Sequence, residues 1–185
     1  MEMDDKKLIE RFLAGDEPSF NELVQKYLKP VYNFLFRLTN DQSAIDDLAQ
    51  DTFLKAWKNI RRFDTQKSFK TWLFAIAKNT AYDYFKKKKA VPFSHFIDRF
   101  GNNRLEEIEE TGSLPDEILD RENSKESLEK ELKNLPAYYQ LILLMAYKDD
   151  FSLHEIAEIL EKPYNTIKSQ HGRALNELKK NLKNK

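Results

Sequence analysis

The chain has 185 residues, and its 31 basic and 31 acidic residues cancel to a formal net charge of zero. It has no cysteine, which excludes disulfides and thiolate metal sites and fits the reducing cytoplasm. The longest apolar run, Leu141–Tyr147, is far shorter than the roughly 20 residues that span a bilayer. The acidic start Met1–Asp5 does not resemble a signal or transit peptide, and four glycines disfavour a Gly-rich phosphate loop. These features predict a cytoplasmic, all-α protein without membrane insertion.

Helical periodicity dominates the first 90 residues. Asp16-Glu17-Pro18 is a good helix start, apolar positions follow to Leu38, and Pro30 is expected to kink or split this helix. Ser43 is predicted to cap a second helix, with a buried stripe of Ile45, Leu48, Ala49, Thr52, Phe53, Ala56, Trp57 and Ile60. Ser68 is predicted to cap a third helix, whose inward residues are Phe69, Trp72, Leu73, Ile76, Ala77 and Thr80.

Residues 91–122 interrupt this periodicity with two prolines, two glycines and the acidic run Glu106–Glu110, which predicts a flexible acidic linker. Further helices are predicted near 123–134, 137–147, 152–160 and 165–182. The sequence therefore predicts two small all-α domains, 1–90 and 123–185, joined by that linker.

Charge is distributed unevenly along this plan. Residues 52–90 hold 11 basic and two acidic residues, residues 162–185 hold seven and one, and the remaining segments are acidic. Two basic blocks separated by acidic sequence predict two anionic contacts, with nucleic acid as the leading candidate.

The second predicted helix carries a polar stripe opposite its core stripe: Asp47, Gln50, Asp51, Leu54 and Lys58. Acids, an amide and an exposed leucine suit a protein partner with basic residues and a small apolar pocket. An ordinary solvated helix face, with acids near its N-terminus, is the plain alternative. An enzyme with aspartate-rich Mg²⁺ helices would need a second acidic cluster and a longer bundle, which the sequence lacks.

Lysines alternate with aromatic rings on the predicted outer face of the third helix: Lys70, Thr71, Phe74, Lys78, Asn79, Tyr82, Phe85 and Lys86. An unpaired base gains roughly 1–3 kcal/mol by stacking on a ring, while lysines follow the backbone, so this face suits melted DNA. The preceding loop, Phe63–Lys67, can line a pocket for an extruded base. Alternatively, Phe74, Tyr82 and Phe85 pack on the helix of residues 20–38, and the sequence leaves both arrangements open.

The last block has helix-turn-helix form. Ser152 begins a capped helix with Ala157 at the crossing, a turn follows at 161–164, and Ile167 faces inward on the second helix. The candidates for a major groove are Asn165, Thr166, Lys168, Ser169, Gln170, Gly172 and Arg173. A helical hairpin that binds nothing is the alternative, and the basic tail argues against it.

Three stretches in this order resemble bacterial RNA polymerase sigma factors of the extracytoplasmic-function (ECF) group, in the sigma-70 family. They are residues 46–57, residues 69–79, and Leu135-Pro136 together with Glu155–Ala157 and Thr166–Ser169. The resemblance implies a sigma region 2 domain at 1–90 and a region 4 domain at 123–185. It implies a dissociable transcription initiation factor that is no enzyme and needs neither cofactor nor metal.

The resemblance also implies partners and site residues. The polar stripe of the second predicted helix would dock on the β′ clamp coiled coil of core polymerase; its residues are Asp47, Gln50, Asp51, Leu54 and Lys58. The β flap of the polymerase is a further expected contact. The melted −10 promoter element would meet Phe63, Asp64, Lys67, Lys70, Trp72, Phe74, Lys78, Asn79, Tyr82 and Lys86. The −35 duplex would meet Asn165, Thr166, Lys168, Ser169, Gln170, Gly172 and Arg173. An anti-sigma factor is a further expected partner, and the free protein is expected to be a monomer.

The sequence departs from the family pattern at Gln170, where Arg is common, and at Gly172, which costs about 1 kcal/mol of helix stability. Asn165 replaces the glycine of the usual Pro-x-Gly-Thr turn and tolerates a left-handed backbone. These changes affect the expected promoter sequence rather than the fold. Two rival functions remain: a stand-alone helix-turn-helix repressor, which would bind a duplex operator without polymerase, and a helical adaptor that binds no DNA.

Overall fold

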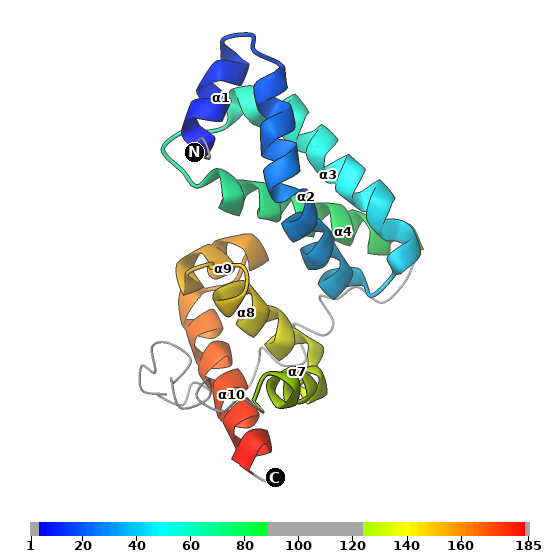
Figure 1. Ribbon diagram of the computed structural model, residues 1–185, viewed down its shortest axis with the longest axis vertical. Helices are drawn as coiled ribbons and strands as arrows, with labels where there is room; N and C mark the ends of the chain where they lie inside the picture. The colour runs from blue at the N-terminus through cyan, green and yellow to red at the C-terminus, as the bar shows by residue number, and fades with distance from the viewer. Residues whose placement is uncertain (1–3, 89–123, 184–185) are drawn as a thin grey trace. The chain divides into compact units, whose positions relative to one another are not determined.

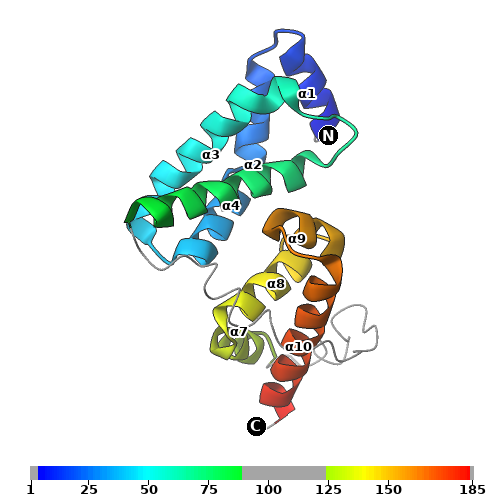
Figure 2. The ribbon, with the colours of Figure 1, turned by 180° about the vertical axis from the view of Figure 1, so that it is seen from behind.

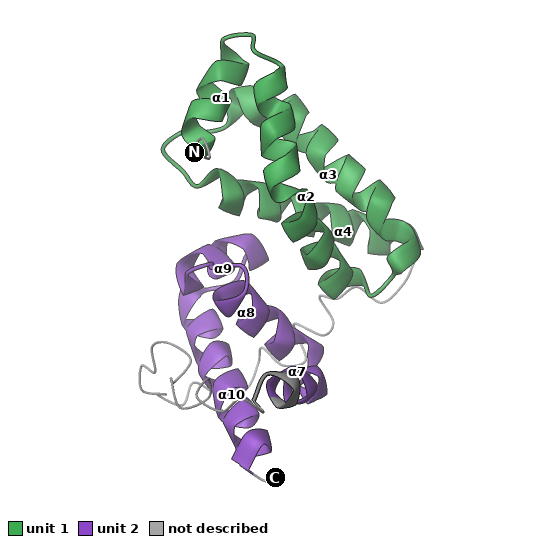
Figure 3. Cartoon of the chain, viewed as in Figure 1, with its two compact units in different colours: residues 1–93 green, residues 94–185 purple. Residues whose placement is uncertain are grey.

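The computed structural model describes residues 4–88 and 124–183, and every regular element in these two ranges is a helix. The chain divides into two compact units, residues 1–93 and 94–185, which Figure 3 colours separately. The predicted all-α class with two helical units is confirmed. The predicted linker, 91–122, lies outside the described residues, so the boundaries 1–90, 91–122 and 123–185 stay predictions.

The first unit is built from four α-helices (Figure 1): α1 Asp5–Leu13, α2 Pro18–Thr39, α3 Ile45–Asn59 and α4 Phe69–Lys88. The helices α2, α3 and α4 pack on one another, and α1 packs on α2. Seen from behind in Figure 2, α3 and α4 lie in front of α2. Their shared core consists mainly of Leu23, Val31, Phe34, Leu35, Ile45, Leu48, Ala56, Leu73, Phe74, Ala77 and Ala81.

Local sequence explains most helix ends in this unit. Pro18 stands in the first turn of α2, and Asn40 ends that helix in the left-handed conformation at φ 50°. Ser68 caps α4, because its Oγ accepts a hydrogen bond from the Thr71 amide at 3.2 Å. The helix α2 continues through Pro30, so the split expected as one outcome there is absent. Tyr27 and Val31, before and after the proline, are both buried.

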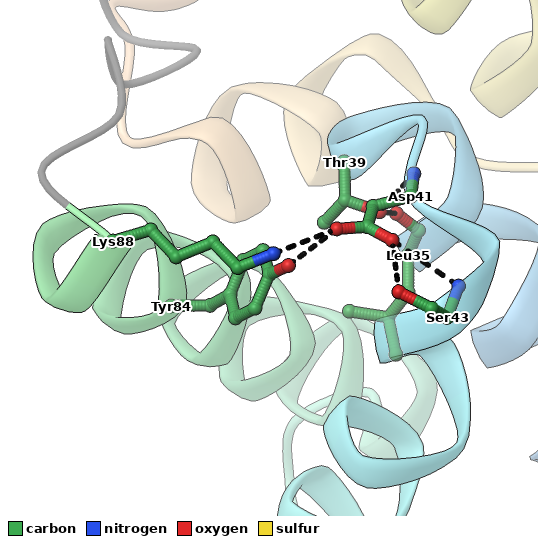
Figure 4. A network of polar contacts seen from close by, with 6 residues as sticks. All are labelled: Leu35, Thr39, Asp41, Ser43, Tyr84 and Lys88. Atoms are coloured by element: carbon green, nitrogen blue, oxygen red, sulfur yellow. Dashed lines mark hydrogen bonds and ion pairs between the residues drawn. The ribbon is translucent and has the colours of Figure 1, made fainter.

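Asp41 ties the turn after α2 to the last turns of α4 (Figure 4). Its Oδ1 accepts hydrogen bonds from the amide and hydroxyl of Ser43 at 3.1 and 2.7 Å. Its Oδ2 accepts from the Tyr84 hydroxyl at 2.5 Å and from Lys88 Nζ at 3.0 Å. These donors, Ser43 foremost, hold the pKa of Asp41 well below its ordinary value. Asp41 therefore caps the short 3-10 helix Gln42–Ala44 that leads into α3. The sequence had predicted Ser43 as the cap of α3, but this helix follows Ala44 and has no side-chain cap.

The second unit consists of α7 Ser124–Asn134, α8 Ala137–Tyr147, α9 Leu153–Leu160 and α10 Tyr164–Lys183. These bounds confirm the four helices predicted for this part of the chain. The helix α10 packs on each of the other three, so it organises the unit. Ser152 and Glu155 form a reciprocal capping box at the start of α9. Glu161 ends α9 in the left-handed conformation at φ 53°. Asn165, which the sequence suggested for a left-handed position in this turn, already belongs to α10.

His171 is buried on α10, and its Nε2 lies 3.0 Å from the Tyr147 hydroxyl, with the two rings stacked. Burial disfavours the imidazolium and lowers the pKa of His171 below its ordinary 6.5. The folded state therefore binds a proton at His171 less readily than the unfolded state does.

We expect the unfolding free energy to fall as the pH drops below about 6.5, because only the unfolded state readily protonates His171. This contribution is complete above pH 6.5 and declines towards the lowered pKa, by at most about 1.4 kcal/mol per pH unit. Urea unfolding followed by circular dichroism at pH 5 and pH 7 measures it. His171→Gln should flatten the pH dependence, and His154→Gln, at an exposed histidine, should not. Equal slopes in both variants would refute the assignment.

Candidate functional site

The outer face of α3 is exposed, as predicted, at Asp47, Gln50, Asp51, Leu54 and Lys58. This exposure follows from the opposite face, where Leu48, Thr52 and Ala56 are buried against α2 and α4. The face combines carboxylates and an amide with an apolar side chain, and so offers contacts to a basic partner surface.

An apolar groove of about 530 Å³ runs between α2 and α3 beside this face. Three large apolar side chains on its lining are unusually exposed: Leu28 by 43%, Leu54 by 46% and Trp57 by 48%. The Tyr32 hydroxyl of α2 hydrogen-bonds the Asp46 carboxylate of α3 at the groove, which raises the pKa of Tyr32. Contiguous exposed apolar surface with a polar rim is typical of a protein-binding site.

Trp57 was predicted to belong to the buried stripe, and this is wrong. Phe53, Ala56 and Ile60 fill the inward positions of α3 and its following turn, so Trp57 lies at the edge of the helix facing the groove. Sequence reasoning also missed Leu28, because a groove between two helices is visible only once their packing is known.

The second candidate surface is the outward side of α4 with the loop before it. Asp64, Lys67, Asn79 and Lys86 are exposed, while Phe63, Lys70, Trp72 and Tyr82 are half-buried. The rings of Phe63, Phe69 and Trp72 form a cluster with centroid separations of 4.9, 5.6 and 5.8 Å. Asp64 shapes the loop, since its Oδ1 accepts a hydrogen bond from the backbone N–H of Gln66 at 3.0 Å. The result is an aromatic platform with lysines around it.

Phe74 and Lys78 do not face outward as predicted, because both side chains are fully buried. The Phe74 ring packs 5.0 Å from that of Phe34, which is the alternative arrangement that the sequence left open. Lys78 Nζ lies 5.2 Å from the centre of the Tyr82 ring, and Thr71 is buried as well. Since α4 packs against both α2 and α3, its buried arc is wider than that of a helix with one neighbour.

The helix-turn-helix presents fewer side chains than predicted. Asn165 is exposed, and the half-buried candidates are Thr166, Lys168, Ser169 and Arg173. Gln170 and Gly172 are buried, so their predicted position on the groove face is wrong. Gln170 is buried because it belongs to the inward stripe of α10, on which Ile167, Gln170, Ala174 and Leu178 follow at helical spacing. Gly172 lies off this stripe, between Lys168 and Ser169 around the helix, and has no side chain to contact a base.

Two contacts support the groove side of α10. The His154 ring of α9 stacks on the Tyr164 ring at a centroid distance of 3.9 Å, which joins the two helices across their turn. The Arg173 side chain hydrogen-bonds the Tyr139 hydroxyl of α8, whose pKa is raised chiefly by burial. Arg173 is thus held at one end of the α10 surface that is predicted to face the major groove.

Protein-family models match both units: Sigma-70 region 2 matches residues 23–91, and Sigma-70 region 4 matches residues 125–178. The chain is 31% identical over 188 residues to the ECF RNA polymerase sigma factor SigW of Bacillus subtilis, which covers 99% of both chains. It belongs to the ECF RNA polymerase sigma factors. The ECF RNA polymerase sigma-E factor of Escherichia coli is 29% identical over 178 residues, or 94% of this chain and 91% of that protein.

Solved structures agree with this membership. CnrH, solved in complex with the cytosolic domain of CnrY, shares the fold with a TM-score of 0.62 at 20% identity, over 97% of each chain. The sigma factor RpoE of Bartonella quintana, solved with the anti-sigma factor NepR, gives 0.59 at 27% identity, over 89% of this chain and 96% of that one. The predicted role as a transcription initiation factor that works with RNA polymerase and promoter DNA is thereby confirmed over the repressor and adaptor alternatives.

Within residues 4–88 and 124–183, this sigma factor has no helix that is both long and apolar enough to cross a membrane. The same residues bring together no three histidine, aspartate or glutamate side chains that could bind a metal ion.

Gln170 offers a test of the inward stripe. It is 1% exposed, and among the described residues neither its amide nitrogen nor its oxygen has a hydrogen-bond partner. An unsatisfied buried polar group costs stability, so Gln170→Met should raise the unfolding free energy by about 1 kcal/mol. Asn176→Met, at an exposed site of the same helix, should stay within about 0.5 kcal/mol of the parent. Urea unfolding measures both; if Gln170→Met instead altered the −35 preference, the residue would face DNA.

Proposed function

We propose that this sigma factor divides its work among three surfaces. The α3 face and the neighbouring groove bind core polymerase, the α4 surface with its loop binds the melted −10 element, and α10 reads the −35 duplex. The observation that carries this proposal is that a single helical unit exposes an acidic, apolar face on α3 and a cluster of aromatic rings with nearby lysines on α4 and its loop. The factor is a dissociable subunit and no enzyme, since RNA synthesis belongs to the polymerase with which it acts in the cytoplasm.

The α3 face is proposed to dock on the β′ clamp coiled coil. Asp47 and Asp51 supply the charge and Gln50 the hydrogen bonds, while Leu54 and Trp57 fill an apolar pocket on the partner. Buried aromatic and aliphatic anchors contribute most of the binding energy at protein interfaces, and charges steer the encounter. Lys58 lies on the same exposed face as a rim contact. The second unit is proposed to meet the β flap.

The α4 surface is proposed to bind DNA strands that have already separated. A duplex hides the faces of its bases, whereas an unpaired base can stack on rings such as Phe63, Trp72 and Tyr82. Lys67, Lys70 and Lys86 supply positive charge for the phosphates. Phe74 and Lys78, buried in the unit, act by holding α4 in place. Asn79 is exposed in the middle of the helix and is the candidate for a hydrogen bond to a base edge.

The second unit is proposed to place α10 in the major groove of the −35 element. Asn165, Thr166, Lys168, Ser169 and Arg173 are the reading candidates, and the basic tail meets phosphates. We further propose the division 1–90, 91–122 and 123–185, with the acidic segment as tether, and a monomeric free protein. Because a relative was solved with an anti-sigma factor, we propose that a partner of this kind regulates the chain.

The double substitution Asp47→Lys with Asp51→Lys tests core binding. Reversing two charges at the interface should weaken the affinity for core polymerase by at least about 30-fold. Fluorescence anisotropy with labelled sigma factor and purified core enzyme measures it. Glu10→Lys, at an exposed acid of α1, is the control and should bind as the parent does. Both variants should melt like the parent, and unchanged binding of the double variant would place the interface elsewhere.

Arg173→Ala tests the −35 assignment. If its guanidinium reads a base, the holoenzyme should lose about 1–3 kcal/mol of discrimination between the preferred −35 sequence and single-base variants of it. Lys180→Ala, at an exposed lysine further along α10, should weaken binding equally on every sequence, as expected for a phosphate contact. Competition binding of the holoenzyme to a set of promoter fragments measures both effects. Uniform weakening by Arg173→Ala would show that this residue only touches phosphate.

A further inference from the structure

A pocket of about 250 Å³ opens between the first turns of α1 and the loop that precedes α4. Phe63 and Phe69 supply aromatic walls, Ile9 an apolar one, and Asp4, Lys6 and Lys67 the polar lining. Pockets for drug-sized ligands usually measure about 300–1,000 Å³, so this one suits a smaller group such as a single nucleobase. Its two sides come from segments about 60 residues apart in the sequence.

Contacts with α2 fix the helix α1 in this position, and α2 in turn contacts the wall of the pocket. Asp5 accepts hydrogen bonds from Lys26 Nζ at 2.8 Å and from the Tyr27 hydroxyl, both on α2. The Tyr27 ring lies 5.8 Å from that of Phe69, which forms part of the pocket wall. The wall that α1 provides is therefore a built part of the first unit. It lies outside the residues that match the family's region 2, which begin at residue 23.

The lining chemistry favours a base over a phosphate. Carboxylates would repel a phosphate, but a carboxylate accepts hydrogen bonds and so pairs with the amino group of a base. Asp5 is already bonded to Lys26 and Tyr27. The side chain of Asp4 makes no capping hydrogen bond to α1 although it precedes the helix, and Asp4 is exposed. Lys6 and Lys67 lie beside it and can meet the strand's backbone.

We propose that α1 forms the second wall of the pocket for an extruded base of the unpaired strand, and that Asp4 selects a base with an exocyclic amino group. The inference rests on the proposed function of the loop, and it adds a specificity-determining residue outside region 2. Adenine, cytosine and guanine each offer Asp4 an amino group, whereas thymine, which has none, leaves the carboxylate without a donor. The aromatic walls hold the ring by stacking, which is indifferent to base identity.

The test uses the full chain in holoenzyme with fork-junction DNA, in which the −10 element is single-stranded. Each unpaired position carries each of the four bases in turn. At positions preferring adenine, cytosine or guanine, an analogue without the amino group (purine, 2-pyrimidinone or hypoxanthine, respectively) replaces the natural base. At one position, removing the amino group should weaken binding by the parent about tenfold. Asp4→Ala should bind the natural base and its analogue equally there, with unchanged preferences elsewhere. Glu10→Ala, an equal charge change on α1, should behave like the parent.

Each outcome has a distinct meaning. If Asp4→Ala keeps the parent's tenfold ratio, or if the parent prefers thymine at every unpaired position, the role of Asp4 is refuted. If the parent holoenzyme distinguishes no base anywhere in the single strand, the proposed function of the loop fails instead. Core binding, measured in parallel by anisotropy, should be the same for all three proteins, which separates a loss of base selection from a loss of assembly.

Discussion

The packing of α4 against α2 and α3 is the constraint on which both surfaces of the first unit depend. The contact of Phe74 with Phe34, together with buried Leu73, Ala77 and Ala81, fixes the rotation of α4 about its axis. That rotation leaves Asn79 and Lys86 outside. The same core takes up the inward face of α3, so the acids and the apolar side chains on its other face stay exposed. One hydrophobic core thereby orients two surfaces of opposite chemistry.

The arrangement of charges in the first unit lets a chain with no net charge offer an acidic and a basic surface side by side. Asp47 and Asp51 of α3 line the same pocket as Lys86 and Lys87 near the end of α4, so the acidic face adjoins the basic end of that helix. Where the two sides meet, Lys55 bridges to Asp83 at 3.0 Å and to Thr80 at 3.2 Å. Both charged partners are largely exposed, so the bridge contributes little to stability. The ion pair marks the place where the acidic face of α3 meets α4.

Periodicity in the sequence was sufficient to predict every described α-helix except α1, together with the α3 face and the helix-turn-helix, because these follow from apolar stripes along single helices. It failed where a side chain's surroundings depend on two neighbours at once. Phe74 and Lys78 are buried because α4 packs on two helices. Trp57 is exposed because it lines the groove between α2 and α3. Gln170 was predictable in principle: it follows Ile167 by three residues on an inward stripe, but its polarity suggested the opposite face. The pocket beside α1 joins segments that no local pattern connects.

The second unit restricts what this sigma factor can read in duplex DNA. With Gln170 and Gly172 buried, the proposed reading face of α10 keeps only five of its seven candidates. Ser169 already donates a hydrogen bond to the Thr166 carbonyl at 3.0 Å, and Arg173 is bonded to Tyr139. Fewer free donors and acceptors mean fewer bases told apart in the major groove, since each base pair is distinguished by its own pattern of donors and acceptors. Under the proposed assignment, a larger share of promoter selection therefore falls to the first unit, where unpaired bases expose edges and faces that the duplex hides.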